Sequence, residues 1–175
     1  MANKKNKVKF NICNVHYAPI TVAEEGTVSF GTPVPMPGAV SISMDPTGEP
    51  ESFYADGIEY YVINNNQGYD GDLELAMIPE SFRTDILKEE QDVNKVLVEN
   101  ANSETGSFAL LFEFDGDIRK IRHVLYNCSA SRPTIESKTN EEDKEVQTET
   151  LTIKARPMAD GYVKAKTGDS TTETV

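Results

Sequence analysis

The chain has 175 residues, enough for one domain, and its 29 acidic residues outnumber 17 basic ones to give a formal net charge of −12. This balance disfavours tight binding to nucleic acid, because lysine and arginine supply most of the affinity for phosphates. No apolar run approaches the ~18 residues that a membrane-spanning helix needs. The basic N-terminus is also not followed by the apolar segment of a signal peptide.

Reactive side chains are few. Cys13 and Cys128 lie far apart in the sequence, and without an export signal we expect buried thiols in a reducing cytoplasm rather than a disulfide. His16 and His123 have no histidine or cysteine neighbour at metal-ligand spacing, and the chain has no glycine-rich phosphate loop, zinc motif or serine elbow. We therefore expect a protein that is not an enzyme and that has no cofactor, catalytic residue or metal site.

The first part of the chain predicts extended structure interrupted by prolines. Residues 1–7 form a polar arm that is rich in lysine. Apolar residues alternate over residues 8–12 and predict a first strand, and residues 17–22 and 26–31 predict further extended segments. Three prolines at a spacing of two make residues 32–38 a rigid extended strap, because proline fixes φ and lacks an amide donor.

A strand and a polar protrusion follow the strap. Apolar and polar residues alternate over residues 39–44, which predicts a strand with one buried face. Asp45–Ser52 contains two prolines and a glycine and predicts a protruding loop that is longer than a tight turn requires. Residues 53–55 would then return from this loop toward the body of the protein.

The stretch Asp56–Pro79 predicts a β-hairpin. Its first strand would be Ile58–Ile63, which is dense in β-branched and aromatic residues, and its turn would be Asn64–Gly68. The second strand alternates between an apolar face and a wet face, with Leu73, Leu75 and Met77 on the first and Asp72, Glu74 and Ala76 on the second. We expect the rest of the chain to extend this sheet.

One helix is predicted after this hairpin, over residues 80–90. It would be about three turns long at 3.6 residues per turn, with Phe82, Ile86 and Leu87 on the face that packs on the sheet. Residues 95–99 predict one more short strand.

The clearest later hairpin spans residues 107–128. Its Asp115-Gly116 pair suits a two-residue turn with positive φ, which would place Leu110 opposite Ile121, although a bulge at Gly116 is an alternative. We interpret the Asp-Gly-Asp sequences at 70–72 and 115–117 as turns rather than calcium sites, because neither continues into a loop with a terminal glutamate.

The last part of the chain predicts a charged connection over residues 129–145 and an alternating strand over residues 146–156. An Asp-Gly pair at 160–161 predicts a third turn, after which residues 162–166 would return along the preceding strand. The small polar residues of 167–175 predict a disordered tail.

Residues 1–175 are thus expected to form a single, mainly β domain, an antiparallel sandwich or barrel with one short flanking helix. Its protrusions are the arm 1–7, the loop 45–52, the acidic loop 129–145 and the flexible tail 167–175. Ordering such segments costs entropy unless something holds them. Without a reactive site, the expected holder is another copy of the chain or a partner protein.

A set of short stretches occurs in a consistent order along the chain: Lys9-Phe10, Asn14–Ala18, Pro33–Val40, Tyr54–Gly57, Gly68–Ala76 with Ile78-Pro79, and, more loosely, Phe112–Gly116 and Tyr126–Cys128. Together they resemble the major tail protein of long, flexible-tailed bacteriophages, which is the subunit of the tail tube. The resemblance covers the first half of the chain and the predicted helix most closely.

The resemblance implies a β-sandwich or barrel-like subunit with one helix. Six such subunits close a ring, and the rings stack into a hollow tube that conducts the genome during ejection. The implied partners are other copies of the chain, a tape-measure protein and tail-end proteins, while DNA passes through without specific binding and no membrane is involved. The implied location is the virion tail, assembled in the cytoplasm of a bacterial host.

Two groups of residues become candidates for roles in such a tube. An acidic wall would repel duplex DNA over a Debye length of roughly 8–10 Å, so Asp70, Asp72 and Glu74 are candidates for facing the lumen. The alternative is that these three acids solvate an outer surface. The candidate contact between rings is the loop Asp45, Pro46, Thr47, Gly48, Glu49 and Pro50.

A second class of function is a β-sandwich module for binding, adhesion or virion decoration. Such modules usually present exposed aromatic platforms. This chain has no tryptophan, and tyrosines such as Tyr60 and Tyr61 lie in predicted strands. The tail tube subunit is therefore the preferred hypothesis.

Overall fold

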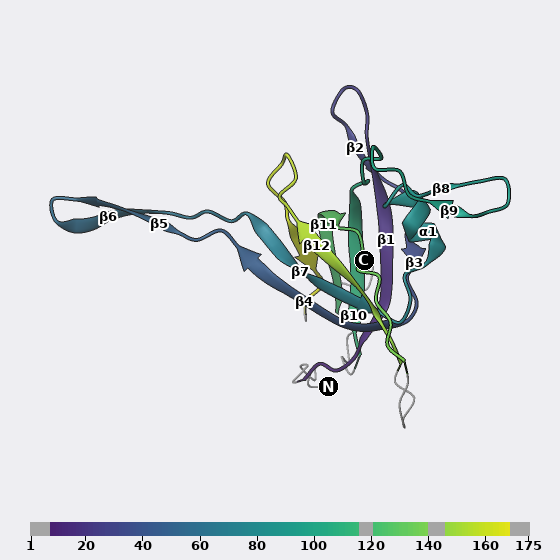
Figure 1. Ribbon diagram of the computed structural model, residues 1–175. Helices are drawn as coiled ribbons and strands as arrows, with labels where there is room; N and C mark the ends of the chain where they lie inside the picture. The colour runs from purple at the N-terminus through teal and green to yellow at the C-terminus, as the bar shows by residue number, and fades with distance from the viewer. Residues whose placement is uncertain (1–7, 116–120, 140–145, 169–175) are drawn as a thin grey trace, which may run out of the picture.

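The structure, a computed structural model, describes residues 8–115, 121–139 and 146–168 (Figure 1). Every strand pairing among these residues is antiparallel. The fold is therefore mainly antiparallel β with one small helix, as the sequence predicts. The elements in chain order are β1 (Ile12–Val22), β2 (Val28–Phe30), β3 (Val34–Pro35), β4 (Ala39–Thr47), β5 (Glu51–Ala55), β6 (Ile58–Ile63), β7 (Gly68–Leu75), α1 (Glu80–Asp85), β8 (Glu90–Gln91), β9 (Leu97–Val98), β10 (Phe108–Phe114), β11 (Arg122–Ala130), β12 (Glu149–Ala155) and β13 (Lys164–Lys166).

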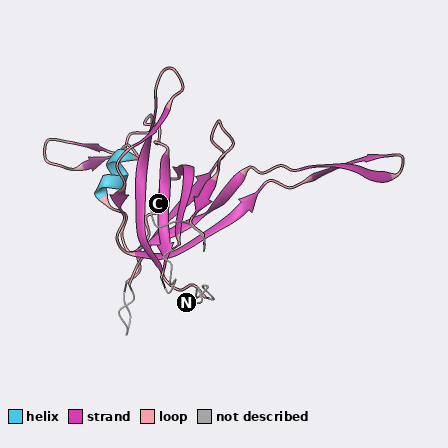
Figure 2. Cartoon of the chain, turned by 180° about the vertical axis from the view of Figure 1, so that it is seen from behind, coloured by secondary structure: helices cyan, strands magenta, loops and turns pink. Residues whose placement is uncertain are grey.

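One large sheet forms the body of the molecule. Its strand order is β2-β1-β10-β11-β12-β7-β4, with β3 added on β1 and β13 added on β11. The sheet curls, so that β1 near one edge contacts β4 at the other. Two further hairpins, β5–β6 and β8–β9, belong to separate two-stranded sheets and extend away from the body (Figure 2).

The core lies inside the curled sheet and follows the alternation of its strands. Leu151, Ile153 and Ala155 of β12 are buried, as are Leu73 and Leu75 of β7, which confirms the predicted buried faces of both strands. Met77 does not share this face: it is 73% exposed, because β7 ends at Leu75.

The helix α1 closes one side of the core with a single aromatic side chain. Phe82 packs edge-on against Tyr17 of β1 and Phe108 of β10, with ring centroids 5.1 and 5.2 Å apart. The Tyr17 hydroxyl donates a 2.9 Å hydrogen bond to Asp85. The helix is shorter than predicted because it ends at Asp85, and Lys88 adopts a positive φ of 60° that no α-helix continues through.

The predicted hairpin of Asp56–Pro79 is wrong in its pairing. β6 pairs with β5, and β7 pairs with β4 on one side and β12 on the other. The turn lies at Asp56-Gly57, where both residues have positive φ, 53° and 77°. This is the Asp-Gly pair of a two-residue hairpin turn, flanked by apolar strands on both sides. The signal was present in the sequence at the start of the stretch rather than in its middle.

The chain therefore does not return to the body at residues 53–55, and the expected loop 45–52 is wrong. Asp45–Thr47 belongs to β4, and Glu51-Ser52 belongs to β5. The Asp-Gly-Asp sequence at 70–72 is also not a turn but part of β7, where a Cβ on Gly71 would overlap the backbone of Ser43. Glycine is needed there because β4 approaches so closely.

The hairpin of β10 and β11 has a different register from the predicted one. Leu110 lies opposite Leu125 rather than Ile121, and Phe112 lies opposite His123. The connection is therefore longer than a two-residue turn, and Gly116 lies outside the described residues. Burial explains the change, because this register puts Leu125 in the core beside Leu110.

The turn at Asp160-Gly161 exists, but the chain does not return along β12. Gly161 has a φ of 86°, and its amide donates to the carbonyl oxygen of Met158 at 2.9 Å. Both β12 and β13 pair antiparallel with β11, at Cys128–Ala130 and at His123–Leu125 respectively. The two strands thus run in the same direction along β11.

The remaining expectations concern the start of the sheet, the long connection and the two ends of the chain. The strap 32–38 stays extended and contributes β3, but the first strand begins only at Ile12, with Val8 and Phe10 exposed. The connection predicted to begin at Ser129 begins only after Ala130, where β11 ends. The arm 1–7, residues 140–145 and residues 169–175 of the tail lie outside the described residues.

Candidate functional site

The most exposed apolar surface of the described chain is the hairpin β5–β6, which we call the distal arm. Both of its strand faces carry apolar side chains, since Phe53 pairs with Tyr61 and Ser52 with Val62. Every residue of β6 is exposed. The distal arm projects far from the body (Figures 1 and 2). Its exposed large apolar side chains are Phe53, Tyr54, Ile58, Tyr60, Tyr61, Val62 and Ile63.

Two short segments that belong to no strand join the distal arm to the sheet. Residues 48–50 and 64–67 lie between β4–β7 and β5–β6 and belong to neither ladder. The Gln67 amide donates to the Thr47 carbonyl at 3.0 Å. Gly48 has a φ of 96°, and a Cβ there would overlap the backbone of Asn65. The candidate contact residues Asp45–Pro50 thus form the base of a long arm rather than its tip.

The candidate lumen acids lie together on the outer, wet face of the sheet. Antiparallel pairing sets Asp70, Asp72 and Glu74 of β7 in register with residues of β4 and β12. The rows are Ser41–Glu74–Thr150, Ser43–Asp72–Thr152 and Asp45–Asp70–Lys154. Alternation places all of these side chains on the face opposite the core. Alternation in the sequence correctly placed the three acids on one face of the strand, but it did not predict the hydroxyl groups that surround them.

Hydrogen bonds surround these acids and favour the charged form of Glu74 and Asp70. Thr148 and Ser41 donate to the two carboxylate oxygens of Glu74 at 2.7 and 2.8 Å, and they lower the pKa of Glu74. Thr152 donates to Asp72 at 2.8 Å. Asp70 forms an ion pair with Arg156, whose hydrogen bond lowers the pKa of Asp70. Glu74 and Asp70 are therefore held as carboxylates at neutral pH.

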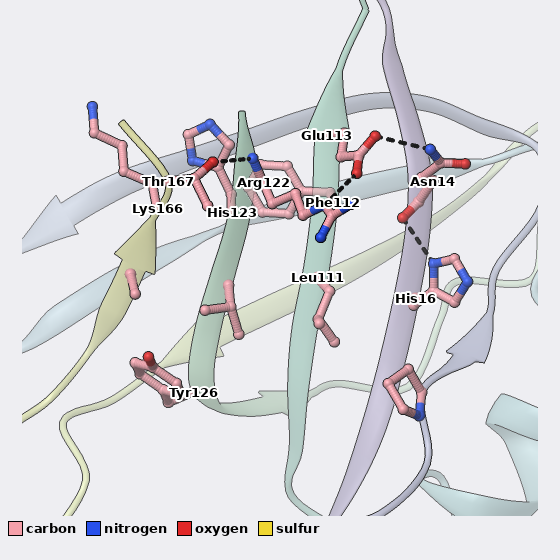
Figure 3. A pocket seen from close by; sticks show the side chains of 13 residues that line it. Asn14, His16, Leu111, Phe112, Glu113, Arg122, His123, Tyr126, Lys166 and Thr167 are labelled. Carbon is pink, nitrogen blue, oxygen red and sulfur yellow. Dashed lines mark hydrogen bonds and ion pairs between the residues drawn. The ribbon is translucent and has the colours of Figure 1, made fainter. Parts of the chain in front are cut away.

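A hollow of about 560 Å³ lies on the other part of the outer face, over β1, β10, β11 and β13 (Figure 3). His16, Leu111 and Val124 stand in one cross-strand row at its centre. Glu113 accepts hydrogen bonds from Asn14 at 2.9 Å and from Arg122 at 3.2 Å. The side chains of Asn14, Glu113 and Arg122 are thus hydrogen-bonded to one another.

This hollow brings together groups that the sequence separates. His16 and His123 both line it. His123 stacks on Phe112 with ring centroids 5.1 Å apart. The described residues contain no group of three or more His, Cys, Asp or Glu side chains placed to hold a metal ion.

Cys128 lies inside the sheet, away from any solvent-accessible site. It is fully buried, as expected from the sequence. Burial raises the pKa of its thiol to about 12. A nucleophilic cysteine needs a thiolate, so this thiol is unsuited to covalent chemistry at neutral pH.

Comparison with known proteins adds no family assignment. No family model matches the sequence, and a search of curated proteins finds no significant relative. Among the described residues, no helix has the length and apolar character needed to cross a membrane.

Proposed function

We propose that this protein is a self-assembling structural subunit that forms stacked rings, six copies to a ring, in the tail tube of a bacteriophage. The observation that carries the proposal is the distal arm, an extended hairpin whose large apolar side chains are exposed to solvent. The resemblance of the sequence to major tail proteins supplies the type of assembly.

The distal arm needs a protein partner for a physical reason. An isolated two-stranded hairpin is marginally stable at best in water. Tyr54, Tyr60 and Tyr61 are each more than 60% exposed in the free chain. A contiguous apolar patch of this kind on a soluble protein marks an interaction surface. Another copy is the simplest partner, since one chain then suffices to build a large object.

The acidic wet face supports a conduit rather than a binding surface for DNA. Duplex DNA carries one negative charge about every 1.7 Å of its axis. A wall that carries Asp70, Asp72 and Glu74 repels it and leaves it free to slide. We propose that this face lines the lumen. The proposed partners are the tape-measure and tail-end proteins, and the proposed location is the virion tail, after assembly in the bacterial cytoplasm.

Truncation of the distal arm tests the proposal. Residues 49–66 are replaced by Asn-Gly, which can close β4 onto β7 with a two-residue turn. We expect the shortened chain to keep the circular dichroism spectrum of the wild type and to form no rings or tubes in electron micrographs at concentrations where the wild type does.

The matched control shortens the other exposed hairpin, β8–β9, which also displays Val93, Val96 and Val98. This variant should still assemble. Tubes formed by the chain without its distal arm would refute the role of the arm. A wild-type protein that stays monomeric at high concentration would refute the assembly itself.

The alternative function is a module for binding or virion decoration, and the 560 Å³ hollow is the observation that favours it. Its centre is apolar, with Leu111, Val124 and Tyr126, and its rim is polar, as in many ligand sites. A strictly monomeric protein that binds a glycan, and that loses binding on Tyr126→Ala, would support this alternative.

A further inference from the structure

A second hollow, of about 260 Å³, opens on the inner side of the curled sheet, and we call it the mouth. It lies where β12 no longer covers β11: β12 pairs with β11 only at Cys128–Ala130, whereas β13 pairs with His123–Leu125. The aromatic rings of Tyr69, Phe112 and Phe114 line it. For comparison, an apolar protein cavity of about 150 Å³ holds benzene, so the mouth has room for an aromatic side chain.

Two lysines stand at the rim of the mouth. The Lys9 ammonium lies 4.7 Å from the ring centroid of Phe114, and the Lys164 ammonium lies 4.3 Å from that of Tyr69. The ion pairs recorded among the described residues all use arginine, and neither lysine takes part in one. The two ammonium groups therefore contact aromatic faces and can still form ion pairs with carboxylates of another chain. Among the described residues, no acidic side chain lines the mouth.

The distal arm has the complementary character. Between Gly48 and Gln67 its charged residues are all acidic: Glu49, Glu51, Asp56 and Glu59. Three tyrosines, Tyr54, Tyr60 and Tyr61, lie on the same arm as these acids. The chain as a whole has a net charge of −12. Within it, the acidic distal arm and the lysine-rimmed mouth carry opposite charges and both present aromatic side chains, so the two surfaces are complementary.

We infer that the mouth is the receptor for the distal arm of a second copy of this chain, an inference that rests on the proposed assembly. The arm of one chain cannot enter the mouth of the same chain. Its base adjoins Met44 and Tyr69, which line the mouth, and its tip lies nine extended residues, roughly 30 Å, away from that base. Arm and mouth are different surfaces, so the contact is heterologous and continues from copy to copy, as a growing tube requires.

Zero-length carbodiimide coupling of the assembled wild-type protein tests the contact directly. A mixture of ¹⁵N-labelled and unlabelled full-length chains is cross-linked and digested for mass spectrometry. We expect peptides in which Glu51, Asp56 or Glu59 of one isotope is joined to Lys9 or Lys164 of the other. Coupling of the arm acids only to other lysines would overturn the inference while leaving assembly intact.

A charge-reversal cycle provides the second test. We expect Lys9→Glu with Lys164→Glu to raise the concentration needed for assembly by about tenfold or more, because like charges then meet at the contact. Glu51→Lys with Glu59→Lys should do the same alone, and combining the two pairs should restore assembly. The control, Lys95→Glu with Lys138→Glu, makes the same charge change at exposed sites elsewhere and should have no such effect.

The outcomes separate the two hypotheses. If the lysine variant assembles at the wild-type concentration, or if the combined variant is not restored, the mouth is not the receptor although the tube remains. If the wild type forms no assembly under any condition, both the receptor and the proposed function are wrong. Rescue by the combined variant also excludes a merely structural effect of the lysine substitutions.

Discussion

Asp70 differs from the other acids of the wet face because a cation holds it. Arg156 forms an ion pair with its carboxylate and also donates to the carbonyl oxygens of Tyr69 and Ala155 at 3.3 Å. One guanidinium thus ties the end of β12 to the start of β7. The hydrogen bond from Arg156 lowers the pKa of Asp70 below its ordinary value.

This pKa shift predicts a pH-dependent difference between the wild type and Arg156→Gln. A lowered pKa in the folded state adds stability above the ordinary carboxylate pKa, and that stability is lost as the pH falls through the folded value. We therefore expect the wild type to be more stable at neutral pH, with a gap that narrows below about pH 4.

Urea denaturation at a series of pH values measures the gap. Lys138→Gln, which removes a cation from an exposed loop, is the control and should show no such trend. A gap that is constant from neutral pH to pH 3 would show that Arg156 acts only through its bonds to the backbone carbonyls.

At the scale of elements, the distal arm pairs with no strand of the main sheet. The strands of the main sheet belong to one continuous set of ladders, whereas β5 and β6 pair only with each other among the described elements. Residues 48–50 and 64–67, which belong to no strand, separate this pair from the ladder of β4 and β7. Local opening should therefore cost little here.

Hydrogen exchange provides the corresponding prediction. In the free subunit, we expect the amides of β5 and β6 to exchange much faster than those of β7 and β12, which pair along their whole length. In assemblies, the arm amides should become protected if the arm docks on another copy. The exposed hairpin β8–β9 serves as the internal control. Fast exchange of the arm in assembled tubes would contradict docking.

For the whole molecule, the distribution of charge matters more than its total. The wet face of β4, β7 and β12 is acidic, and the mouth on the inner side is rimmed by lysines. A subunit with this polarity can attract a neighbour at one surface and repel DNA at another. In the proposed assembly, this separation of charge would allow a strongly acidic chain to associate with other copies of itself.

Reversal of the wet face tests the lumen assignment. We expect assemblies of Asp72→Lys with Glu74→Lys to retain fluorescent duplex DNA, with retention that falls steeply as salt increases, because lysines release counterions from the phosphates. Wild-type assemblies should not retain it. The control, Glu104→Lys with Asp160→Lys, makes the same charge change at exposed loops. Equal retention by both variants would place Asp72 and Glu74 outside the lumen.

The sequence alone determined the local features of this protein. Alternation identified the buried faces of β7 and β12, and the short apolar stripe around Phe82 identified the helix. The three acids of the wet face could be grouped for the same reason, since residues two apart on a strand share a face. Each of these features depends on side chains that are close in the chain.

Only the tertiary structure decided which strands are neighbours. Ile58–Ile63 pairs with β5 instead of β7, and Phe112 lies opposite His123, because backbone hydrogen bonds join any two extended segments and packing selects among the possible registers. The same long-range choice left the arm unpartnered and opened the mouth where β13 replaces β12 beside β11. The mouth forms from segments far apart in the chain, so no local pattern in the sequence could reveal it, whereas the arm has a local signal in its Asp56-Gly57 turn.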